Sequence, residues 1–223
     1  TTVWMMTELT QYKGFYVRHR YDKLIVDEKD WLNLELRTDD VVLDVGAYIG
    51  TFAVRVAPFV KVVVSYEPDP SNFELLTLNT QNLTNVARQR SAIISDADTV
   101  PEVNFGETTV ILRQAKAPYS NSVVRGKAET GVVVPAIGWQ SVLNTFKPDI
   151  VKMDIEGGEF SLDFGSLPTN TRTLALELHP TRKQWQNEEE PRIRRQLEEQ
   201  GFKPVVDKRA GQWRQNVILV VKR

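Results

Sequence analysis

Residues 41–51, which read VVLDVGAYIGT, join a short apolar run to a turn that contains two glycines. The apolar run is typical of a buried parallel strand, with Asp44 close to its carboxyl end. Gly46 and Gly50 permit a tight turn and the close approach of a ligand where the strand passes into a helix. A helix that begins near Thr51 would present free N–H groups to polar or anionic ligand atoms. This segment therefore predicts a nucleotide-type binding site.

The spacing of these glycines restricts the type of nucleotide. Dinucleotide-binding turns read G-x-G-x-x-G, but Tyr48 occupies the position of the second glycine here. A bulky side chain at that position would crowd a pyrophosphate, whereas a cofactor without phosphates tolerates it better. Glu67, followed by Pro68, lies about 20 residues after Gly46, the spacing at which a carboxylate binds ribose hydroxyls. The alternative is an ordinary strand–turn–helix with an acidic surface loop.

Further polar residues lie at the ends of the other predicted strands. Ligands of doubly wound sheets bind beyond the carboxyl ends of the strands, close to the reversal of strand order. The residues that we expect at those ends are Asp44, Glu67, Ser91 with Ala92, Asp154 with Glu156, and Glu177 with His179. So many polar groups at one edge are hard to explain by folding alone, and they indicate a binding or catalytic site.

Asp154 begins the motif DIEGGE, directly after a predicted strand over residues 149–153. That strand should place Asp154 beside the cofactor, where its carboxylate could orient the cofactor or the acceptor. Glu156 and Glu159 could instead be acids that stabilise the N-terminus of a helix, and we adopt this interpretation for Glu159.

His179 is one of two histidines in the chain. In an extended strand its side chain points to the same side as that of Glu177, and an imidazole that titrates near neutral pH could accept a proton from a substrate hydroxyl. Alternatively, His179 only fills space at the end of the strand. A divalent metal held by some of Asp154, Glu156, Glu177 and His179 is a third interpretation. The absence of a clear paired-ligand motif favours the route without metal.

The alternation of strands and helices predicts a doubly wound parallel sheet. The expected strands cover residues 41–45, 60–66, 92–95, 149–153, 173–178, 202–206 and 217–221. The expected helices cover residues 51–57, 71–81, 137–146 and 188–200, and Ser71 with Glu74 predicts a capping box for the second helix. Residues 1–36 are expected to form a cap, with strands at 15–20 and 23–26 and a helical turn at 28–34, and residues 37–223 the main domain.

The cap and the irregular segment over residues 99–135 should together shape the acceptor pocket, because specificity usually resides in such loops. Within that segment we expect short strands at 103–105 and 110–113 and a polar turn at 119–126. Aromatic residues that could pack against a ring of the substrate are Trp4, Tyr12, Phe15, Tyr16 and Tyr119. The alternative is that these rings bury the cap on the sheet.

The composition is that of one α/β domain of 223 residues. The 28 basic and 29 acidic residues nearly cancel, so no overall charge would attract nucleic acid or a membrane. Without cysteine, the chain has no disulfide, thiolate metal site or cysteine nucleophile. It has no apolar stretch near the roughly 20 residues of a membrane span and no signal-peptide pattern. We expect a cytoplasmic protein, and its start at Thr1 suggests a piece of a longer chain.

Four motifs in this order, VVLDVGAYIGTF, SYEPDPSNFELLTLN, VKMDIEGGE and LALELH, resemble the FkbM family of S-adenosylmethionine-dependent methyltransferases. The resemblance covers roughly residues 40–179. It implies a Rossmann-like, seven-stranded, mostly parallel sheet with an antiparallel last strand and helices on both faces. It also implies methyl transfer from S-adenosylmethionine, mostly to hydroxyl oxygens, here of a small molecule or a sugar.

The resemblance also implies the positions of the site residues. Asp44, Gly46 and Gly50 match the first cofactor motif, Glu67 the ribose-binding acid, and Asp154 the acidic end of the fourth strand. The expected cofactor-binding residues are Asp44, Gly46, Ala47, Gly50, Glu67, Pro68, Ser91, Ala92 and Asp154. The expected catalytic residues are Asp154, Glu177 and His179.

Two other functions agree with parts of the sequence. Lys152, Asp154 and Glu177 faintly suggest the Lys/Asp/Glu set of a nucleic-acid 2′-O-methyltransferase, although the balanced charge makes nucleic acid the less favoured partner. Lys152 could simply be a strand residue whose stem packs on a neighbour. The chain could also be a cofactor-binding module without catalysis that serves as a partner subunit. No feature of the sequence predicts an oligomeric state.

Overall fold

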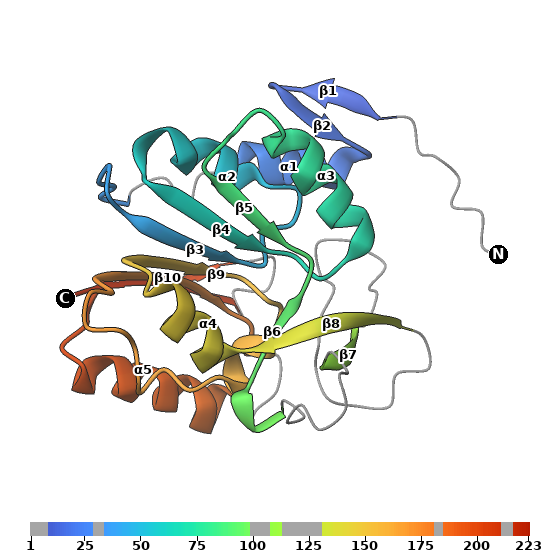
Figure 1. Ribbon diagram of the computed structural model, residues 1–223. Helices are drawn as coiled ribbons and strands as arrows, with labels where there is room; N and C mark the ends of the chain where they lie inside the picture. Colours follow the sequence, from blue (N-terminus) through green and yellow to red (C-terminus); the bar gives the residue numbers. More distant parts are fainter. Residues whose placement is uncertain (1–8, 29–33, 99–107, 113–130, 181–184, 211–215) are drawn as a thin grey trace.

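The computed structural model describes residues 9–28, 34–98, 108–112, 131–180, 185–210 and 216–223. Its centre is a seven-stranded sheet with the order β11-β12-β10-β9-β3-β4-β5 (Figure 1). These strands are β3 (Val41–Val45), β4 (Val62–Tyr66), β5 (Val86–Gln89), β9 (Ile150–Met153), β10 (Thr173–Leu178), β11 (Lys203–Ala210) and β12 (Asn216–Lys222). Within this sheet β12 runs antiparallel to both of its neighbours, and the other strand pairs are parallel. The predicted sheet with an antiparallel last strand is therefore confirmed.

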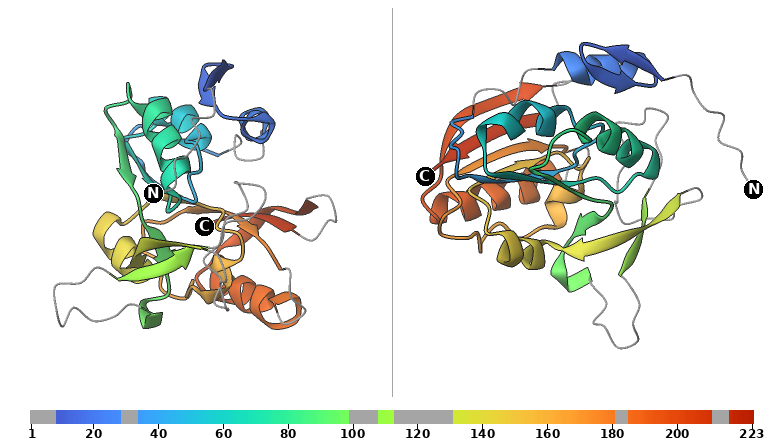
Figure 2. Two further views of the ribbon diagram at one scale, coloured as in Figure 1. Left: turned by 90° about the vertical axis from the view of Figure 1, so that its right-hand side faces the viewer. Right: turned by 45° about the horizontal axis from the view of Figure 1, so that its top comes forward.

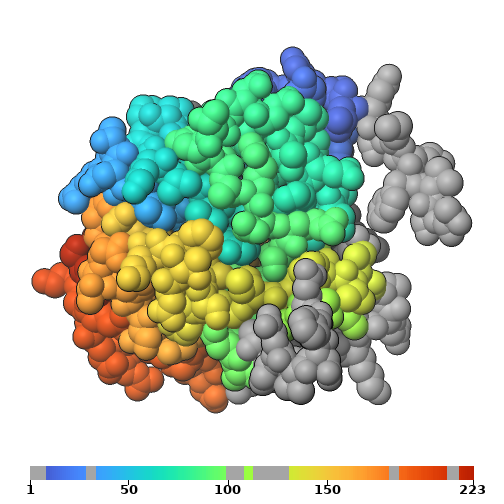
Figure 3. Space-filling view, in the orientation of Figure 1, coloured from blue at the N-terminus to red at the C-terminus, as the bar shows by residue number. Residues whose placement is uncertain are grey.

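Helices cover both faces of the sheet (Figures 1 and 2). One face carries α2 (Thr51–Val56) and α3 (Pro70–Thr80), and the other carries α4 (Trp139–Phe146) and α5 (Glu190–Glu199). Figure 3 shows α3 and β5 in green above α4 in yellow on one side of the molecule. Strands covered on both faces need mostly apolar residues, which explains why β3, β9 and β10 are mainly apolar apart from Asp44, Lys152 and Glu177.

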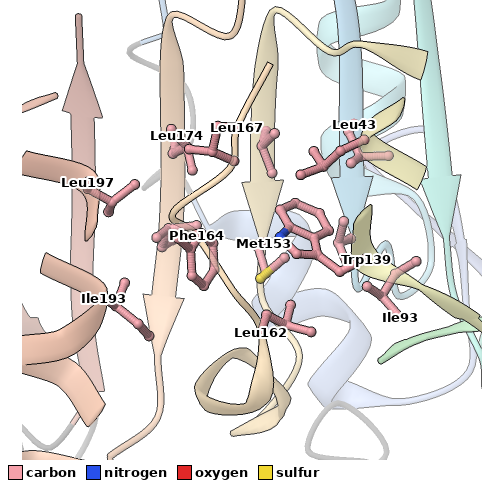
Figure 4. Packing of buried hydrophobic residues seen from close by; sticks show 14 of the residues in the cluster. Leu43, Ile93, Trp139, Met153, Leu162, Phe164, Leu167, Leu174, Ile193 and Leu197 are labelled. Atoms are coloured by element: carbon pink, nitrogen blue, oxygen red, sulfur yellow. The ribbon is translucent and has the colours of Figure 1, made fainter. Parts of the chain in front are cut away.

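The larger core lies between the sheet and the helices α4 and α5 (Figure 4). Trp139, Met153 and Phe164 are fully buried there, and the Trp139 indole N–H donates to the Asp163 carbonyl at 2.8 Å. The smaller core on the opposite face packs Phe52 and its neighbours in α2 against the strands. Full burial of one large apolar side chain contributes about 1.5–3 kcal/mol, so these two layers fix the strand ends that carry the site.

A second, three-stranded sheet follows β5, in the order β6-β8-β7. It consists of β6 (Ala92–Ile94), β8 (Val132–Gly138) and β7 (Thr109–Leu112). The prediction that residues 92–95 are the third strand of the main sheet was therefore wrong, because β5 holds that place. The helix predicted to start at Ile137 begins at Trp139, since Ile137 pairs with Ile93 in this sheet.

The cap consists of β1 (Thr10–Tyr12), β2 (Phe15–Val17) and the helix α1 (Arg20–Asp27), and it packs against α2 and α3 (Figure 2). The strand predicted at residues 23–26 was wrong. Asp22 and Val26, the buried residues of α1, are four apart, which is the period of one helix face. Phe15 is buried in the cluster that joins the cap to α3, so its ring anchors the cap. Residues 29–33, 103–105 and 119–126, with Trp4 and Tyr119, lie outside the described residues.

The predicted start of α3 also differs from the structure. The N-cap of α3 is Asp69, whose carboxylate accepts hydrogen bonds from the backbone N–H groups of Ser71 and Asn72. The Ser71–Glu74 capping box was therefore wrong by two positions, because the aspartate already satisfies these donors. The helix α2 begins at Thr51, as predicted, and Gly50 is its N-cap.

Candidate functional site

The glycine turn after β3 is pressed against the end of β9. Gly46 has φ +79°, and a Cβ atom built on it would lie 1.8 Å from the Asp154 carbonyl oxygen. The backbone N–H groups of Gly46 and Ala47 both donate to the Tyr66 carbonyl, at 3.0 and 2.9 Å. Only glycine combines this φ with so close an approach. The turn therefore joins the ends of β3, β4 and β9 at the point where the strand order reverses.

Tyr48, the bulky residue of the turn, is anchored in the cap. Its φ is 51°, and its side chain packs into the core of the cap, where the hydroxyl donates to Asp22 Oδ1 at 2.5 Å. The backbone N–H of Tyr48 donates to Glu67 Oε2 at 2.9 Å. Burial, together with the hydrogen bond to Asp22, raises the pKa of Tyr48, so the phenol stays protonated. Tyr48 thus connects the cap to the glycine turn.

Glu67 lies at the carboxyl end of β4, 6% exposed. Its second oxygen accepts from the Asp69 N–H at 2.9 Å and from the Asn72 amide at 3.3 Å. Burial raises the pKa of Glu67 to about 7, although the backbone N–H groups of Asp69 and Tyr48 act in the opposite direction. The carboxylate is therefore fixed in position at the sheet edge. Pro68 leads from it to the cap of α3.

Ser91 and Ala92 lie at the same edge, although not for the predicted reason. They follow β5, and Gln89 at the end of that strand accepts a hydrogen bond from the Glu67 N–H at 3.1 Å. The strand β5 was not predicted, because its sequence VARQ is short and partly polar, and Ala92 itself begins β6.

A polar row crosses the sheet beneath the turn. Asp44 is the register partner of Ser65 in β4 and of Lys152 in β9. Lys152 Nζ lies 3.4 Å from Asp44 Oδ1 and donates to the Gly46 carbonyl at 2.7 Å. Burial raises the pKa of Asp44 and Lys152 opposes that rise, whereas the pKa of Lys152 is raised by the carboxylates of Asp44 and Asp154 despite its own burial. Lys152 therefore supports the turn as well as Asp44.

His179 stands at the centre of a second group of polar residues. Its Nε2 atom lies 3.5 Å from Glu156 Oε2, 3.6 Å from Glu177 Oε1 and 3.7 Å from Asp154 Oδ1. Its Nδ1 atom lies 3.2 Å from Glu159 Oε1, which also accepts the His179 backbone N–H at 2.5 Å. The structure therefore brings all three predicted catalytic residues together and adds Glu156 and Glu159.

Glu159 lies in the first turn of a short 3-10 helix over Gly158–Ser161, as expected from the sequence, and it also has a second role. It is fully buried, and its two oxygens accept from His179 and from the Gly157 N–H at 2.8 Å, so it is a partner of the histidine as well as a helix-terminal acid. Only the spacing of Asp154, Glu156 and Glu159 within one short motif hinted at a shared role. Their convergence on His179 is visible only in three dimensions.

The charges of this group change the proton affinities of its members. Burial lowers the pKa of His179, but the hydrogen bond with Glu159 and the nearby carboxylates outweigh it and raise the pKa to about 10. Burial raises the pKa of Glu156 to about 8, and burial with the charge of Asp154 raises that of Glu177 to about 7. When no other cation is bound to this group, the imidazole of His179 is therefore protonated at neutral pH and cannot act as a base.

Asp154 belongs to both groups of residues. Its backbone N–H donates to the Val45 carbonyl at 2.9 Å, its carbonyl faces Gly46, and its carboxylate faces His179. The Oδ1 atoms of Asp154 and Asp44 are buried and make no hydrogen bond within the described part of the chain. Acceptor atoms in this situation suit a ligand that carries N–H donors or positive charge.

The strand order and the polar edge define a nucleotide-binding α/β protein of the methyltransferase class. The chain matches the methyltransferase FkbM domain over residues 44–204, and it therefore belongs to this family, whose methyl donor is S-adenosylmethionine. No curated protein matches it in sequence.

Two solved structures share the fold at low sequence identity. The FkbM methyltransferase of Methylobacillus flagellatus KT is 15% identical with a TM-score of 0.51, and the match covers 86% of this chain and 45% of that protein. The chain thus spans less than half the length of this relative. P. horikoshii TYW2, solved with MeSAdo, is also 15% identical, with a TM-score of 0.53 and coverage of 96% and 70%. Among the described residues, no helix has the length and apolar character that crossing a bilayer requires.

Proposed function

We propose that this chain transfers a methyl group from S-adenosylmethionine to a hydroxyl oxygen of a small molecule or sugar. The observation that carries the proposal is the acidic edge at the reversal of strand order. There Asp44, Glu67 and Asp154 offer carboxylates around a glycine turn, and the nearby lysine is occupied by Gly46 and Asp44. Such an edge fits a cofactor with positive charge and no phosphates.

Each proposed cofactor contact follows from the position of a residue. Glu67 is held rigidly at the end of β4, so its carboxylate can accept hydrogen bonds from two ribose hydroxyls. The turn from Gly46 through Ala47 to Gly50 would lie along the amino-acid part of the cofactor, and Asp44 would support this turn from below. Pro68, Ser91 and Ala92, at the ends of β4 and β5, would border the nucleoside.

The cofactor supplies a methyl group on a sulfonium; its carbon–sulfur bond breaks as the acceptor oxygen bonds to carbon, and the electron pair stays on sulfur. The protein has to align the acceptor with this methyl group and help the hydroxyl to lose its proton. Asp154, Glu177 and His179 form a polar group next to the glycine turn, which suits both tasks. When no other cation is bound, the imidazole of His179 is already protonated at neutral pH. The group that accepts the proton of the acceptor hydroxyl would then be a carboxylate beside it rather than His179 itself.

The test is incubation of the chain with methyl-labelled S-adenosylmethionine and a panel of hydroxylated metabolites, sugars, amines and a short RNA. We expect label on a hydroxylated small molecule or sugar and a methoxy signal in the NMR spectrum of the product. Transfer to the RNA would favour the nucleic-acid 2′-O-methyltransferase. Binding of the cofactor without transfer to any acceptor would favour the non-catalytic module, and an N-methyl product would contradict oxygen as the acceptor atom.

A further inference from the structure

The contacts of His179 Nε2 with its three carboxylates have an unusual length. At 3.5, 3.6 and 3.7 Å they exceed the 2.7–3.2 Å of ordinary N–H···O hydrogen bonds. An imidazolium that donated to one carboxylate would be expected to draw that partner closer. Instead the three oxygens lie at nearly equal distances from Nε2 of His179, a residue that is only 5% exposed.

These separations fit ligands that share one cation. Around an ion with bonds of about 2.1 Å, neighbouring ligand atoms lie about 3.0–3.4 Å apart and opposite atoms about 4.2 Å apart. One ligand atom each from Asp154, Glu156 and His179 lie within 4.8 Å of one another. A bound ion therefore needs only small side-chain movements to bring these atoms to bonding distance.

Two further observations point to a ligand at this position. Asp154 Oδ1, the oxygen that faces His179, is buried and makes no hydrogen bond to any described residue. Glu159 is fully buried and accepts from Nδ1, so Nδ1 carries a proton and the lone pair of the neutral ring is at Nε2. A carboxylate that orients a histidine from behind in this way is typical of metal-ligating histidines.

We propose that Asp154, Glu156 and His179 form a binding site for one divalent cation of the Mg²⁺ or Mn²⁺ type. Carboxylate oxygens with a single imidazole are the donor set that suits these ions. Glu177 lies beside the site, and its Oε1 accepts from the Asn216 amide at 2.9 Å, so it would hold a water of the ion rather than the ion itself.

The cation gives the group a role that the lone histidine lacks. This part of the inference rests on the proposed methyl transfer: a divalent cation next to Asp154 would lower the pKa of an acceptor hydroxyl that contacts it, without a free protein base. It would also bring positive charge to Asp154, Glu156 and Glu177, which surround a single imidazole.

The direct test is titration of the full chain with Mn²⁺, followed by electron paramagnetic resonance. We expect one ion per chain and a ¹⁴N coupling to the bound Mn²⁺ from the imidazole nitrogen. His179→Gln should abolish the coupling, and both His179→Gln and Glu156→Gln should weaken Mn²⁺ binding about tenfold or more. The matched control is Glu198→Gln, on an exposed part of α5, which should bind Mn²⁺ like the wild type.

A second variant separates orientation from folding. Glu159→Gln keeps the size of the side chain but weakens its hold on Nδ1, so Mn²⁺ affinity should fall 10–100-fold while S-adenosylmethionine affinity stays within about twofold. A wild-type chain that binds no Mn²⁺, or that binds it without ¹⁴N coupling, would overturn the proposal. Cofactor binding and methyl transfer with full activity in EDTA would leave the methyltransferase intact and reject the cation. Mn²⁺ binding with ¹⁴N coupling but without methyl transfer would support the cation site and contradict the proposed methyl transfer.

Discussion

The hydroxyl of Tyr48 donates to Asp22 Oδ1 at 2.5 Å and so joins the glycine turn to the first helix of the cap. Asp22 is fully buried and also accepts from the backbone N–H and the guanidinium of Arg18. Arg18 in turn donates to Ser71 and Asn72 at the start of α3. The cap therefore supports the turn, whereas from the sequence we expected it to shape the acceptor pocket or to bury its rings on the sheet.

Replacing Asp22 by alanine should disturb both the cap and the turn. The change leaves the largely buried Arg18 charge and the Tyr48 hydroxyl without their partner at Asp22, which costs about 3 kcal/mol or more of the free energy of unfolding. We also expect weaker binding of S-adenosylmethionine, measured by calorimetry. Asp27→Asn is the control, because its ion pair with Lys13 is exposed and should contribute little. Equal stability of the two variants would contradict this role of the cap.

Lys152→Met should unfold at a clearly lower urea concentration than the wild type. In this variant the buried carboxylate of Asp44 loses its cationic partner, and the Gly46 carbonyl loses its hydrogen-bond donor. Breaking a buried ion pair in this way lowers the free energy of unfolding by about 3–5 kcal/mol. In the double variant Asp44→Asn/Lys152→Met, the two losses should be less than additive. A Lys152→Met chain with normal stability but no turnover would instead support the catalytic lysine of the nucleic-acid methyltransferase.

The close approach at Gly46 is testable against a second glycine with the same backbone conformation. Gly201 has φ +85° and open space around it, whereas at Gly46 an added Cβ would meet the Asp154 carbonyl. Gly201→Ala should lower the free energy of unfolding by only about 1–2 kcal/mol, the cost of placing an alanine in the left-handed backbone conformation. Gly46→Ala should cost at least about 2 kcal/mol more, by chemical denaturation, because the turn and β9 must separate. Equal losses would show that the contact is not tight.

The sequence predicts the fold where the physical signal is local. Strands β3, β9 and β10 are mainly apolar because both of their faces are buried, and their ranges differ from the prediction by at most one residue. The edge strand β5 has partly exposed polar residues and was missed, while β6 resembles a core strand in sequence but pairs with β8. Which of several apolar segments enters a given sheet depends on tertiary packing.

The same limit holds for the candidate site. Asp154, Glu177 and His179 could be placed at one edge because parallel strands bring their carboxyl ends together. The pairing of Glu159 with His179 joins residues 20 apart in the chain, and that of Tyr48 with Asp22 joins residues 26 apart. Neither pairing leaves a periodic signal, so the bond between Glu159 and His179 and the burial of Tyr48 in the cap could not be predicted from the sequence.

Cofactor affinity should depend on pH through Glu67. Its pKa of about 7 reflects burial and the neighbouring Asp69. Below that pH the protonated carboxyl gives up an acceptor site, and above it both oxygens can accept ribose hydroxyls, so affinity for S-adenosylmethionine should rise between about pH 6 and pH 8. Glu67→Gln, which does not ionise, should bind more weakly and with a flatter pH dependence. An unchanged slope in this variant would assign the titration to another group.

The most direct test of the account is calorimetry of S-adenosylmethionine binding to the Glu67→Ala chain at about pH 8. Two hydrogen bonds to a charged carboxylate are each worth about 1.5–3 kcal/mol, so the dissociation constant should rise at least about 100-fold. Glu74→Ala, an exposed acid on α3, is the control and should bind like the wild type. If Glu67→Ala bound the cofactor as tightly as the wild type, the cofactor would not lie at this edge of the sheet and the account would be contradicted.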